Sequence, residues 1–450
     1  MDIVPIIDAG LGNSSYLVDL GDGSALVVDP QRNPSPYLQA AEQRVLRLRF
    51  TVETHLHADF VSGSRELMAQ GAELFAPAAS ELSFDHRRLD DGDEIDVGGL
   101  TLRAIATPGH TPEHLAYLLV DASVPLALFS GGTLIVGGVA RTDLLSEDLT
   151  EPLARAAYRS IHDRLLVLPD DLAVYPTHGA GSFCSVGTTG ERTTTIGRER
   201  RSNPLLRADT EDEFVATLLG GLGSYPPYFG SMRDLNRAEP VVYGAEPPVL
   251  RPLPSDEVAK LQAGGALVVD ARPIERYAAS HIPDSLSIEL RDQFGVWLGW
   301  LADPQRPIVV VVDDDQDIAG LVWQILNVGF EPPKGRLAGG IAAWRAAGRP
   351  VHKTDLIGAE GVNGSRTIVD VRQLAEWQKQ HVPGATHVEL GDIAAYASRL
   401  DGDIQLHCGH GQRAMTAASL LEQAGLVDLA VTTGGPTEIA AALAGGRPQG

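Results

Sequence analysis

Cysteine is scarce in this chain of 450 residues, which contains only Cys184 and Cys408. Two thiols exclude a disulfide framework and a cysteine-rich zinc site, and they are typical of a protein from a reducing compartment. Each cysteine is therefore either an inert residue or a group with a chemical role.

Positive charge and long apolar runs are scarce as well. The chain has 36 Lys and Arg against 59 Asp and Glu, a net charge of −23. Nucleic acids and anionic membranes would repel such a chain, so we expect neither as a partner. No apolar run reaches the roughly 18 residues of a membrane span. The N-terminus has no basic segment followed by an apolar core, and we therefore expect a cytoplasmic protein without a signal peptide.

An internal repeat occupies the second half of the chain. The segment VVDARPIERYAASHIPDSLSIEL begins at Val268, and its counterpart IVDVRQLAEWQKQHVPGATHVEL begins at Ile368. Each copy alternates short apolar runs with helical patterns, which predicts two α/β domains with parallel sheets. The expected boundaries are a first region at residues 1–242, a proline-rich linker at 243–254, and the two copies at 255–356 and 357–450.

The first region contains apolar strands that end in polar loops, and three of these loops carry histidine. They read VETHLHADF, TPGH and YPTHG. Alternate residues of an extended segment point the same way, so two imidazoles of the first loop can converge on one cation. Imidazoles and carboxylates are good ligands for zinc and iron. The candidate metal ligands are His55, His57, Asp59, His110 and His178.

These motifs, in this order, resemble the metallo-β-lactamase fold over about residues 1–200. The segment FSGGTLIVGGVARTDL resembles the persulfide dioxygenase and glyoxalase II branch of that superfamily. The resemblance implies an αββα sandwich with a metal site. Two positions depart from the family: Phe60 replaces a histidine that binds a second metal in the hydrolases, and Gly132 replaces an aspartate ligand.

The two departures bear on the metal. Phe60 favours a mononuclear Fe(II) site over a dinuclear one, with zinc as the alternative metal. Gly132 counts against metal binding and oxygenase activity, because it removes the carboxylate that would complete a 2-His-1-carboxylate triad on Fe(II). The carboxylate of Asp59 or the imidazole of His57 would complete the site in place of the missing aspartate. A degenerate domain without metal is the remaining alternative.

A second candidate site is the loop Cys-Gly-His-Gly-Gln-Arg, which runs from Cys408 to Arg413 in the second copy. Glycines let backbone N–H groups turn toward the sulfur, and the helix that follows presents its positive N-terminus. Both effects favour a thiolate and an anionic sulfur substrate, and Arg413 adds positive charge. We expect substrate contacts from Gly409, His410, Gly411 and Gln412.

This loop and the surrounding IVDVR and HVPGA segments resemble a rhodanese, a sulfurtransferase that carries sulfane sulfur as a cysteine persulfide. In the first copy, alignment through Gly329 and Gly425 places Val312 at the cysteine position, in an acidic loop VDDDQD. That copy therefore resembles an inactive rhodanese domain. We interpret Asp370 and Arg372 as a structural pair.

Two further residues of the first region are candidates. Cys184 follows His178 by six positions, so it is either a sulfur acceptor or relay near the metal or a plain loop residue. Arg141, in the segment GVARTDL, either holds the carrier end of the substrate or pairs with a structural carboxylate.

Together the two resemblances predict an enzyme of persulfide metabolism. One site would oxidise a low-molecular-weight thiol persulfide to sulfite with O₂, and the other would transfer sulfane sulfur through Cys408, with sulfite or thiosulfate as a partner. We expect a homo-oligomer. The alternatives are a zinc-dependent thioester hydrolase of glyoxalase II type with attached rhodaneses, and a degenerate metal domain around one working sulfurtransferase. The thiol carrier and the direction of sulfur transfer stay open.

Overall fold

Residues 2–187, 189–362 and 364–445 are described by the computed structural model, and the chain divides into two units. The first unit comprises Met1–Pro247 and Trp323–Gly329, and the second comprises Pro248–Val322 and Phe330–Gly450. Within the described ranges, no helix is both long and apolar enough to cross a membrane.

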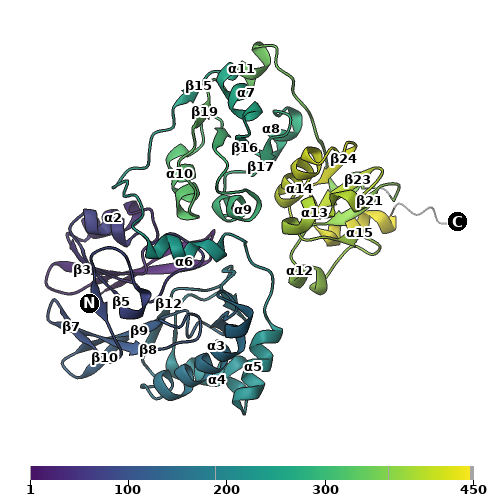
Figure 1. The fold of residues 1–450 in the computed structure, drawn as a ribbon. Helices are drawn as coiled ribbons and strands as arrows, with labels where there is room; N and C mark the ends of the chain where they lie inside the picture. The colour runs from purple at the N-terminus through teal and green to yellow at the C-terminus, as the bar shows by residue number, and fades with distance from the viewer. Residues whose placement is uncertain (1, 188, 363, 446–450) are drawn as a thin grey trace. The chain divides into compact units, whose positions relative to one another are not determined.

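The first unit contains two six-stranded sheets and a small two-stranded one (Figure 1). The first large sheet has the order β1-β2-β3-β4-β5-β6 and the second the order β14-β12-β10-β9-β8-β7, while β11 pairs with β13. The strands are β1 (Ile3–Asp8), β2 (Asn13–Asp19), β3 (Ser24–Val28), β4 (Arg47–Val52), β5 (Glu73–Pro77), β6 (Arg87–Leu89), β7 (Glu94–Val97), β8 (Leu100–Ala106), β9 (Leu115–Asp121), β10 (Val124–Gly131), β11 (Val139–Ala140), β12 (Ala173–Pro176), β13 (Ser185–Val186) and β14 (Thr194–Thr195).

Apolar side chains of both large sheets meet in a central core, where Tyr16 and Phe129 pack. Further apolar clusters join the outer face of each sheet to helices. Central strands such as β3 are buried on both faces, which explains why the sequence there is a continuous apolar run instead of an alternating one. The helices are α1 (Ser35–Gln43) and α2 (Ser64–Ala69) on the first sheet, α3 (Glu147–Arg159) and α5 (Glu211–Gly220) on the second, and α4 (Ile196–Ser202) and α6 (Phe229–Arg237). The expected αββα sandwich is confirmed.

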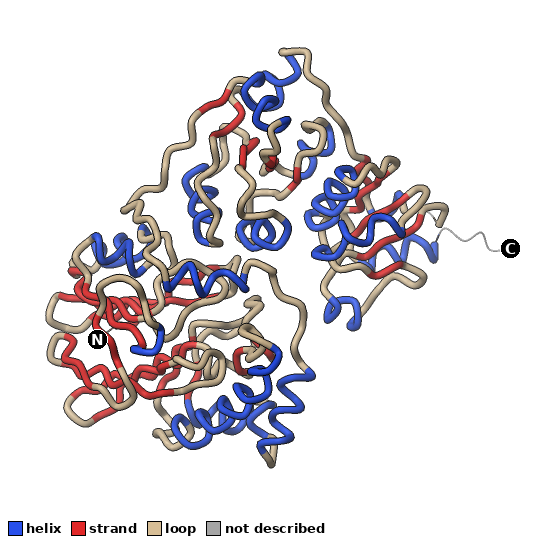
Figure 2. Tube along the Cα trace, in the orientation of Figure 1, coloured by secondary structure: helices blue, strands red, loops and turns tan. Residues whose placement is uncertain are grey.

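The second unit contains two five-stranded sheets, drawn with their flanking helices in Figure 2. Their orders, β15-β19-β18-β16-β17 and β20-β24-β23-β21-β22, are equivalent, and every pairing is parallel. The strands are β15 (Pro252–Leu253), β16 (Leu267–Asp270), β17 (Leu286–Ser287), β18 (Ile308–Val311), β19 (Gly335–Leu337), β20 (Asp355–Ile357), β21 (Thr367–Asp370), β22 (Thr386–His387), β23 (Ile404–His407) and β24 (Leu429–Thr432). The expected pair of α/β copies with parallel sheets is confirmed.

The helices of the two copies follow the strands in the same sequence. The first copy has α7 (Ser255–Ala263), α8 (Ile274–Ala279), α9 (Phe294–Leu301), α10 (Ile318–Asn327), whose second half falls in the first unit, and α11 (Gly340–Ala346). The second copy has α12 (Leu374–Lys379), α13 (Ile393–Tyr396), α14 (Gln412–Gln423) and α15 (Pro436–Gly445).

A buried ion pair recurs in both copies. The guanidinium of Arg272 lies 2.6 Å from the carboxylate of Asp270, and that of Arg372 lies 2.6 Å from Asp370. Each arginine also donates to a backbone carbonyl just after the next helix, at 2.8 Å in the first copy and 2.7 Å in the second. Because the aspartate ends a strand, the pair joins that strand to the end of α8 or α12. The expected structural role of Asp370 and Arg372 is therefore borne out by their contacts.

We predict that Asp370→Ala destabilises the second copy strongly. The substitution leaves the buried guanidinium of Arg372 without a counter-charge, which costs about 3–5 kcal/mol. Hydrogen exchange of the β21 and β23 amides measures this as a lower free energy of opening. The control is Glu257→Ala, which breaks an exposed pair with Arg251 and should cost less than about 1 kcal/mol. Equal losses in the two variants would contradict the prediction.

Candidate metal centre and cysteine loop

The candidate ligands of the first unit lie in loops that follow strands of both sheets. His55, His57 and Asp59 follow β4, His110 follows β8, and His178 follows β12. All five side chains are buried. One nitrogen each of His55, His110 and His178 lies within 4.8 Å of the other two. The fold therefore brings together residues that are more than 120 positions apart in the sequence.

Hydrogen bonds on the outer side of the rings determine the tautomers of two of these histidines. The Thr54 hydroxyl donates to Asp29 at 2.8 Å, so it accepts from Nδ1 of His55, also at 2.8 Å. Nδ1 of His110 donates to the carbonyl of Arg141 at 2.7 Å. In a neutral imidazole the other nitrogen, Nε2, then carries the lone pair that can bind a metal.

His178 is held in the same way. The amide of Asn13 donates to Asp59 at 2.6 Å, which leaves its oxygen to accept from Nδ1 of His178 at 3.0 Å. Nε2 of His178 then lies 3.4 Å from Nε2 of His55. Two facing lone pairs repel unless a cation lies between them. Two nitrogens bound tetrahedrally to one zinc or iron ion at 2.0–2.1 Å are about 3.4 Å apart, so the separation suits a shared metal.

The surroundings fit a metal as well. Three buried atoms of the candidate ligands have no hydrogen-bond partner among the described residues: Nε2 of His110, Nδ1 of His57 and Oδ1 of Asp59. Burial lowers the pKa of His110 and of His178 to about 3. Burial also lowers the pKa of His55 far below its ordinary value. Neutral imidazoles are the form that binds metals. His55, His110 and His178 would hold the ion, with the carboxylate of Asp59 beside His178.

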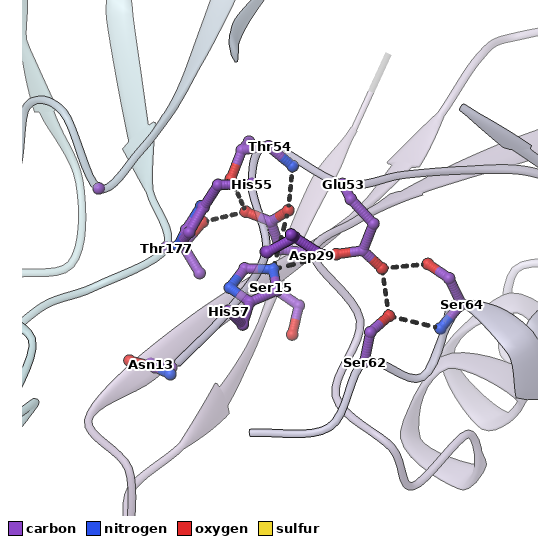
Figure 3. Close-up of polar contacts among 12 residues, drawn as sticks. Asn13, Ser15, Asp29, Glu53, Thr54, His55, His57, Ser62, Ser64 and Thr177 are labelled. Atoms are coloured by element: carbon purple, nitrogen blue, oxygen red, sulfur yellow. Dashed lines mark hydrogen bonds and ion pairs between the residues drawn. The ribbon is translucent and has the colours of Figure 1, made fainter. Parts of the chain in front are cut away.

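His57 directs its Nε2 toward two carboxylates, as Figure 3 shows. Nε2 lies 3.0 Å from Glu53 and 3.4 Å from Asp29. Burial alone would lower the pKa of His57, but the charges and hydrogen bonds of Asp29 and Glu53 raise it to about 10. The Phe60 ring stacks on this imidazole with centroids 4.2 Å apart. His57 is thus engaged by Asp29 and Glu53, and the protonated ring that these carboxylates favour has no lone pair for a metal ion.

Sequence reasoning missed Asp29, which directly follows β3, and Glu53, which directly follows β4 and lies two residues before His55. It also missed His114, whose ring stacks on His55 with centroids 5.0 Å apart. Nε2 of His114 accepts from the backbone N–H of Gly132 at 2.9 Å, and Nδ1 lies 2.9 Å from the hydroxyl of Thr107. Both nitrogens are occupied, so His114 supports the site without binding the metal. The only signal was its spacing of four residues from His110.

Gly132, at the position of the family aspartate, lies directly beside His110. A Cβ atom there would lie 2.6 Å from Cδ2 of His110. Because the Arg141 carbonyl holds that ring through Nδ1, a side chain at position 132 would have to displace a candidate ligand. The glycine and the placement of His110 are therefore mutually adapted.

Cys184 and Arg141 both lie near this centre, but they differ in their contacts. Cys184 is fully buried, and burial, followed by the adjacent charge of Asp59, raises the pKa of its thiol. Arg141 makes a bidentate pair with Asp143 at 2.7 and 2.8 Å, and its guanidinium lies over the ring of Tyr225. The structure thus shows the second alternative for Arg141, pairing with a carboxylate. Cys184 lies beside a candidate ligand, as its place in the sequence predicts.

The cysteine loop of the second copy connects β23 to α14. Cys408 is the first residue after the strand and is 2% exposed. Gly411 has a φ of 101°, a conformation that favours glycine. Its N–H thereby donates to Sγ of Cys408 at 3.2 Å. Arg413 lies in the first turn of α14 and pairs with Glu376 at 2.6 and 2.9 Å.

The remaining loop positions differ in exposure. Gly409 and Gln412 are half-buried, and His410 is exposed. In the first copy, Val312 is the first residue after β18, the strand equivalent to β23, and it is buried. The next residue, Asp313, pairs with Arg276 at 2.7 Å. The first copy therefore has an apolar side chain at the cysteine position, as the alignment predicts.

Known proteins resemble both units. The rhodanese-like domain family matches residues 254–347 and 355–442. The human mitochondrial persulfide dioxygenase ETHE1 is 32% identical over 217 residues, which are 47% of this chain and 78% of that protein. The chain belongs to the ETHE1-like metallo-β-lactamase family. It carries two rhodanese-like domains in addition.

Two other relatives widen the comparison. A hydroxyacylglutathione hydrolase from Methylobacillus flagellatus is 38% identical over 180 residues, covering 39% of this chain and 66% of that protein. The crystal structure of a metallo-β-lactamase from Staphylococcus aureus subsp. aureus COL is 28% identical, with a TM-score of 0.65, and covers 75% of this chain and 98% of its own. The chain is therefore similar to a hydrolase as well as to a dioxygenase.

We predict that Asn13→Ala weakens metal binding by the first unit. The substitution removes the acceptor that holds the ring of His178, and loss of such an outer partner typically costs about 10–100-fold in affinity. Competition with a chromophoric chelator measures the dissociation constant of Zn²⁺ or Fe²⁺. Asn33→Ala, in the loop before α1, serves as the control and should bind as the wild type does. Unchanged affinity in Asn13→Ala would show that the hydrogen bond from His178 to Asn13 does not contribute to metal binding.

Proposed function

We propose that the first unit oxidises a low-molecular-weight thiol persulfide. The overall reaction is RSSH + O₂ + H₂O → RSH + SO₃²⁻ + 2 H⁺, in which the outer sulfur loses four electrons to O₂. The observation that carries the proposal is the convergence of three Nε2 lone pairs, from His55, His110 and His178, in a region 32% identical to a persulfide dioxygenase. An iron ion bound there would supply the redox chemistry and the open positions for both reactants.

The chain itself holds the ligands and keeps the site dry. Thr54, Asn13 and the carbonyl of Arg141 orient the three rings before any substrate binds. His57 lies next to these imidazoles, and the charges and hydrogen bonds of Asp29 and Glu53 hold its ring in place and balance its charge.

We further propose that Cys408 carries sulfane sulfur. Its thiolate would attack the outer sulfur of thiosulfate or of a persulfide, form Cys–S–S⁻ and release sulfite or a thiol. The N–H of Gly411, 3.2 Å from Sγ, supports this because it can stabilise the negative charge at each stage. Arg413 is paired with Glu376, so its charge is partly neutralised and the backbone N–H groups contribute more.

The product of the first proposed reaction is a substrate of the second. Sulfite released by the first unit is a substrate for Cys408 persulfide, which would convert it to thiosulfate. The first rhodanese-like copy lacks a thiol at the equivalent position, so we assign it a structural role. The partners of the whole chain are then a thiol persulfide, O₂, sulfite and thiosulfate.

A zinc-dependent thioester hydrolase is the second candidate, favoured by the 38% identical hydroxyacylglutathione hydrolase. Two observations weigh against it. Phe60 occupies the position of a second-metal ligand and stacks on His57. Gly132 lacks the carboxylate that bridges two metals in that family. A scaffold without metal is disfavoured by the 3.4 Å separation of the Nε2 atoms of His55 and His178, which suits two ligands of one metal ion.

Two variants separate the proposed reactions. We predict that His110→Gln, in the iron-loaded full chain, lowers O₂ uptake with glutathione persulfide by at least about 100-fold, because it removes a ligand. The same variant should keep its thiosulfate:cyanide sulfurtransfer. Cys408→Ser should abolish sulfurtransfer and leave O₂ uptake unchanged. An oxygen electrode and a thiocyanate assay measure the two activities.

The controls test each unit separately. His162→Gln changes a histidine that stacks on Tyr158 outside the metal centre and should leave both activities unchanged. The hydrolase hypothesis is correct if the iron-loaded wild type consumes no O₂ with a persulfide and the zinc-loaded wild type hydrolyses a glutathione thioester. Undiminished sulfurtransfer in Cys408→Ser would contradict the role of that cysteine.

A further inference from the structure

A second group of metal-binding side chains lies in the other unit. His281 and His352 belong to the first rhodanese-like copy, and Glu422 belongs to α14 of the second. Nε2 of His281 lies 3.0 Å from Oε2 of Glu422, and Nδ1 of His352 lies 2.9 Å from Oε1. The three side chains do not take part in either proposed reaction.

The backbone holds the two histidines next to each other. The N–H of His281 donates to the carbonyl of His352 at 3.1 Å, and the N–H of His352 donates back at 2.9 Å. The ring centroids are 6.2 Å apart, and the planes are nearly perpendicular. This pairing presents both imidazoles to one carboxylate without the need for long, flexible side chains.

The tautomer of His281 makes its contact with Glu422 unfavourable unless a cation is present. Nδ1 donates to the carbonyl of Tyr277 at 3.0 Å, and the Tyr277 ring stacks on the imidazole at 3.9 Å. In the neutral ring, Nε2 therefore carries a lone pair, which faces a carboxylate oxygen at a buried site. Either a second proton on the ring or a metal ion between the two atoms removes this repulsion.

Several features favour the metal. The Nδ1–H···O=C bond of His281 is the usual outer contact of a metal-binding histidine. Ligands bound to one zinc ion at 2.0–2.2 Å lie about 3–3.5 Å apart, close to the separations seen here. His352 is 54% exposed and Glu422 only 16%, so an ion can enter from solvent and keep water as a further ligand.

We propose that His281, His352 and Glu422 bind a divalent first-row metal ion, with Zn²⁺ as the expected occupant, and that this ion joins the two rhodanese-like copies. Two imidazoles and one carboxylate are a donor set that zinc commonly accepts. Glu422 lies near the C-terminus of α14, the helix that begins beside Cys408. The ion would therefore fix the helix of the active loop to the inactive copy, independently of the function proposed for either catalytic site.

The second copy offers a matched control. His381 is the counterpart of His281, and its Nδ1 likewise contacts a backbone carbonyl, that of Trp377, at 3.1 Å. It is exposed and belongs to none of the metal-binding groups found among the described residues. His381→Gln therefore removes an equivalent imidazole without touching the proposed site.

The test is zinc stoichiometry of the full chain, by equilibrium dialysis and metal analysis of the metal-stripped protein. We expect His352→Gln and Glu422→Gln each to bind about one Zn²⁺ fewer than the wild type, and His381→Gln to bind the same number. Because the first unit is also proposed to bind a metal ion, His110→Gln/His352→Gln should lose one more equivalent than either single variant. His352 is half exposed, so its variant should fold normally, which circular dichroism verifies.

A second readout uses hydrogen exchange. Added Zn²⁺ should slow exchange of the α14 amides in the wild type and in His381→Gln, but not in His352→Gln. Equal zinc content in the wild type and His352→Gln, or equal zinc effects on α14 in both, would overturn the proposal. In that case a protonated His281 paired with Glu422 accounts for the contact.

Discussion

The Nδ1–H groups of His55, His110 and His178 donate to a hydroxyl, a backbone carbonyl and an amide oxygen. These outer hydrogen bonds point three Nε2 lone pairs at one place, and the metal chemistry of the first unit depends on that orientation. Thr54 lies just after β4, Arg141 directly follows β11, and Asn13 is the first residue of β2. The αββα sandwich thus supplies both the candidate ligands and the groups that orient them. The buried carboxylates of Asp29 and Glu53 lie beside these ligands and contact His57.

The proposed reactions require anions to reach both sites of a protein with a net charge of −23. Arg141 is bound by Asp143, and Arg413 is bound by Glu376, so carboxylates balance both charges. The charge of His57 is likewise balanced by Asp29 and Glu53. At the cysteine loop, the N–H of Gly411 donates to Cys408, and Arg291 of the first copy interacts with the charge of that cysteine. Local dipoles and buried charges can outweigh a distant surface charge because solvent and salt screen the latter.

The sequence was sufficient for the fold class, the tandem repeat and the residues that come together, because these depend on local motifs and periodic apolar patterns. It did not reveal which nitrogen of each histidine faces the metal, since that depends on Asn13, Thr54 and the Arg141 carbonyl, which carry no recognisable spacing. It did not show that His57 faces Asp29 and Glu53, or that Arg141 is engaged by Asp143, because these contacts exist only after the loops pack. Long-range pairs of this kind are set by tertiary packing.

The Asp–Arg pair has a consequence for how the rhodanese-like copies can change. In both copies it ties a strand to the end of the next helix. Among the described residues, its side-chain hydrogen bonds involve neither the segment from Cys408 to Arg413 nor the equivalent acidic loop. Framework and reactive loop are therefore separable parts of the same domain. The loop can therefore be lost or exchanged while the scaffold is retained. By the same argument, a cysteine loop can be introduced into the inactive copy.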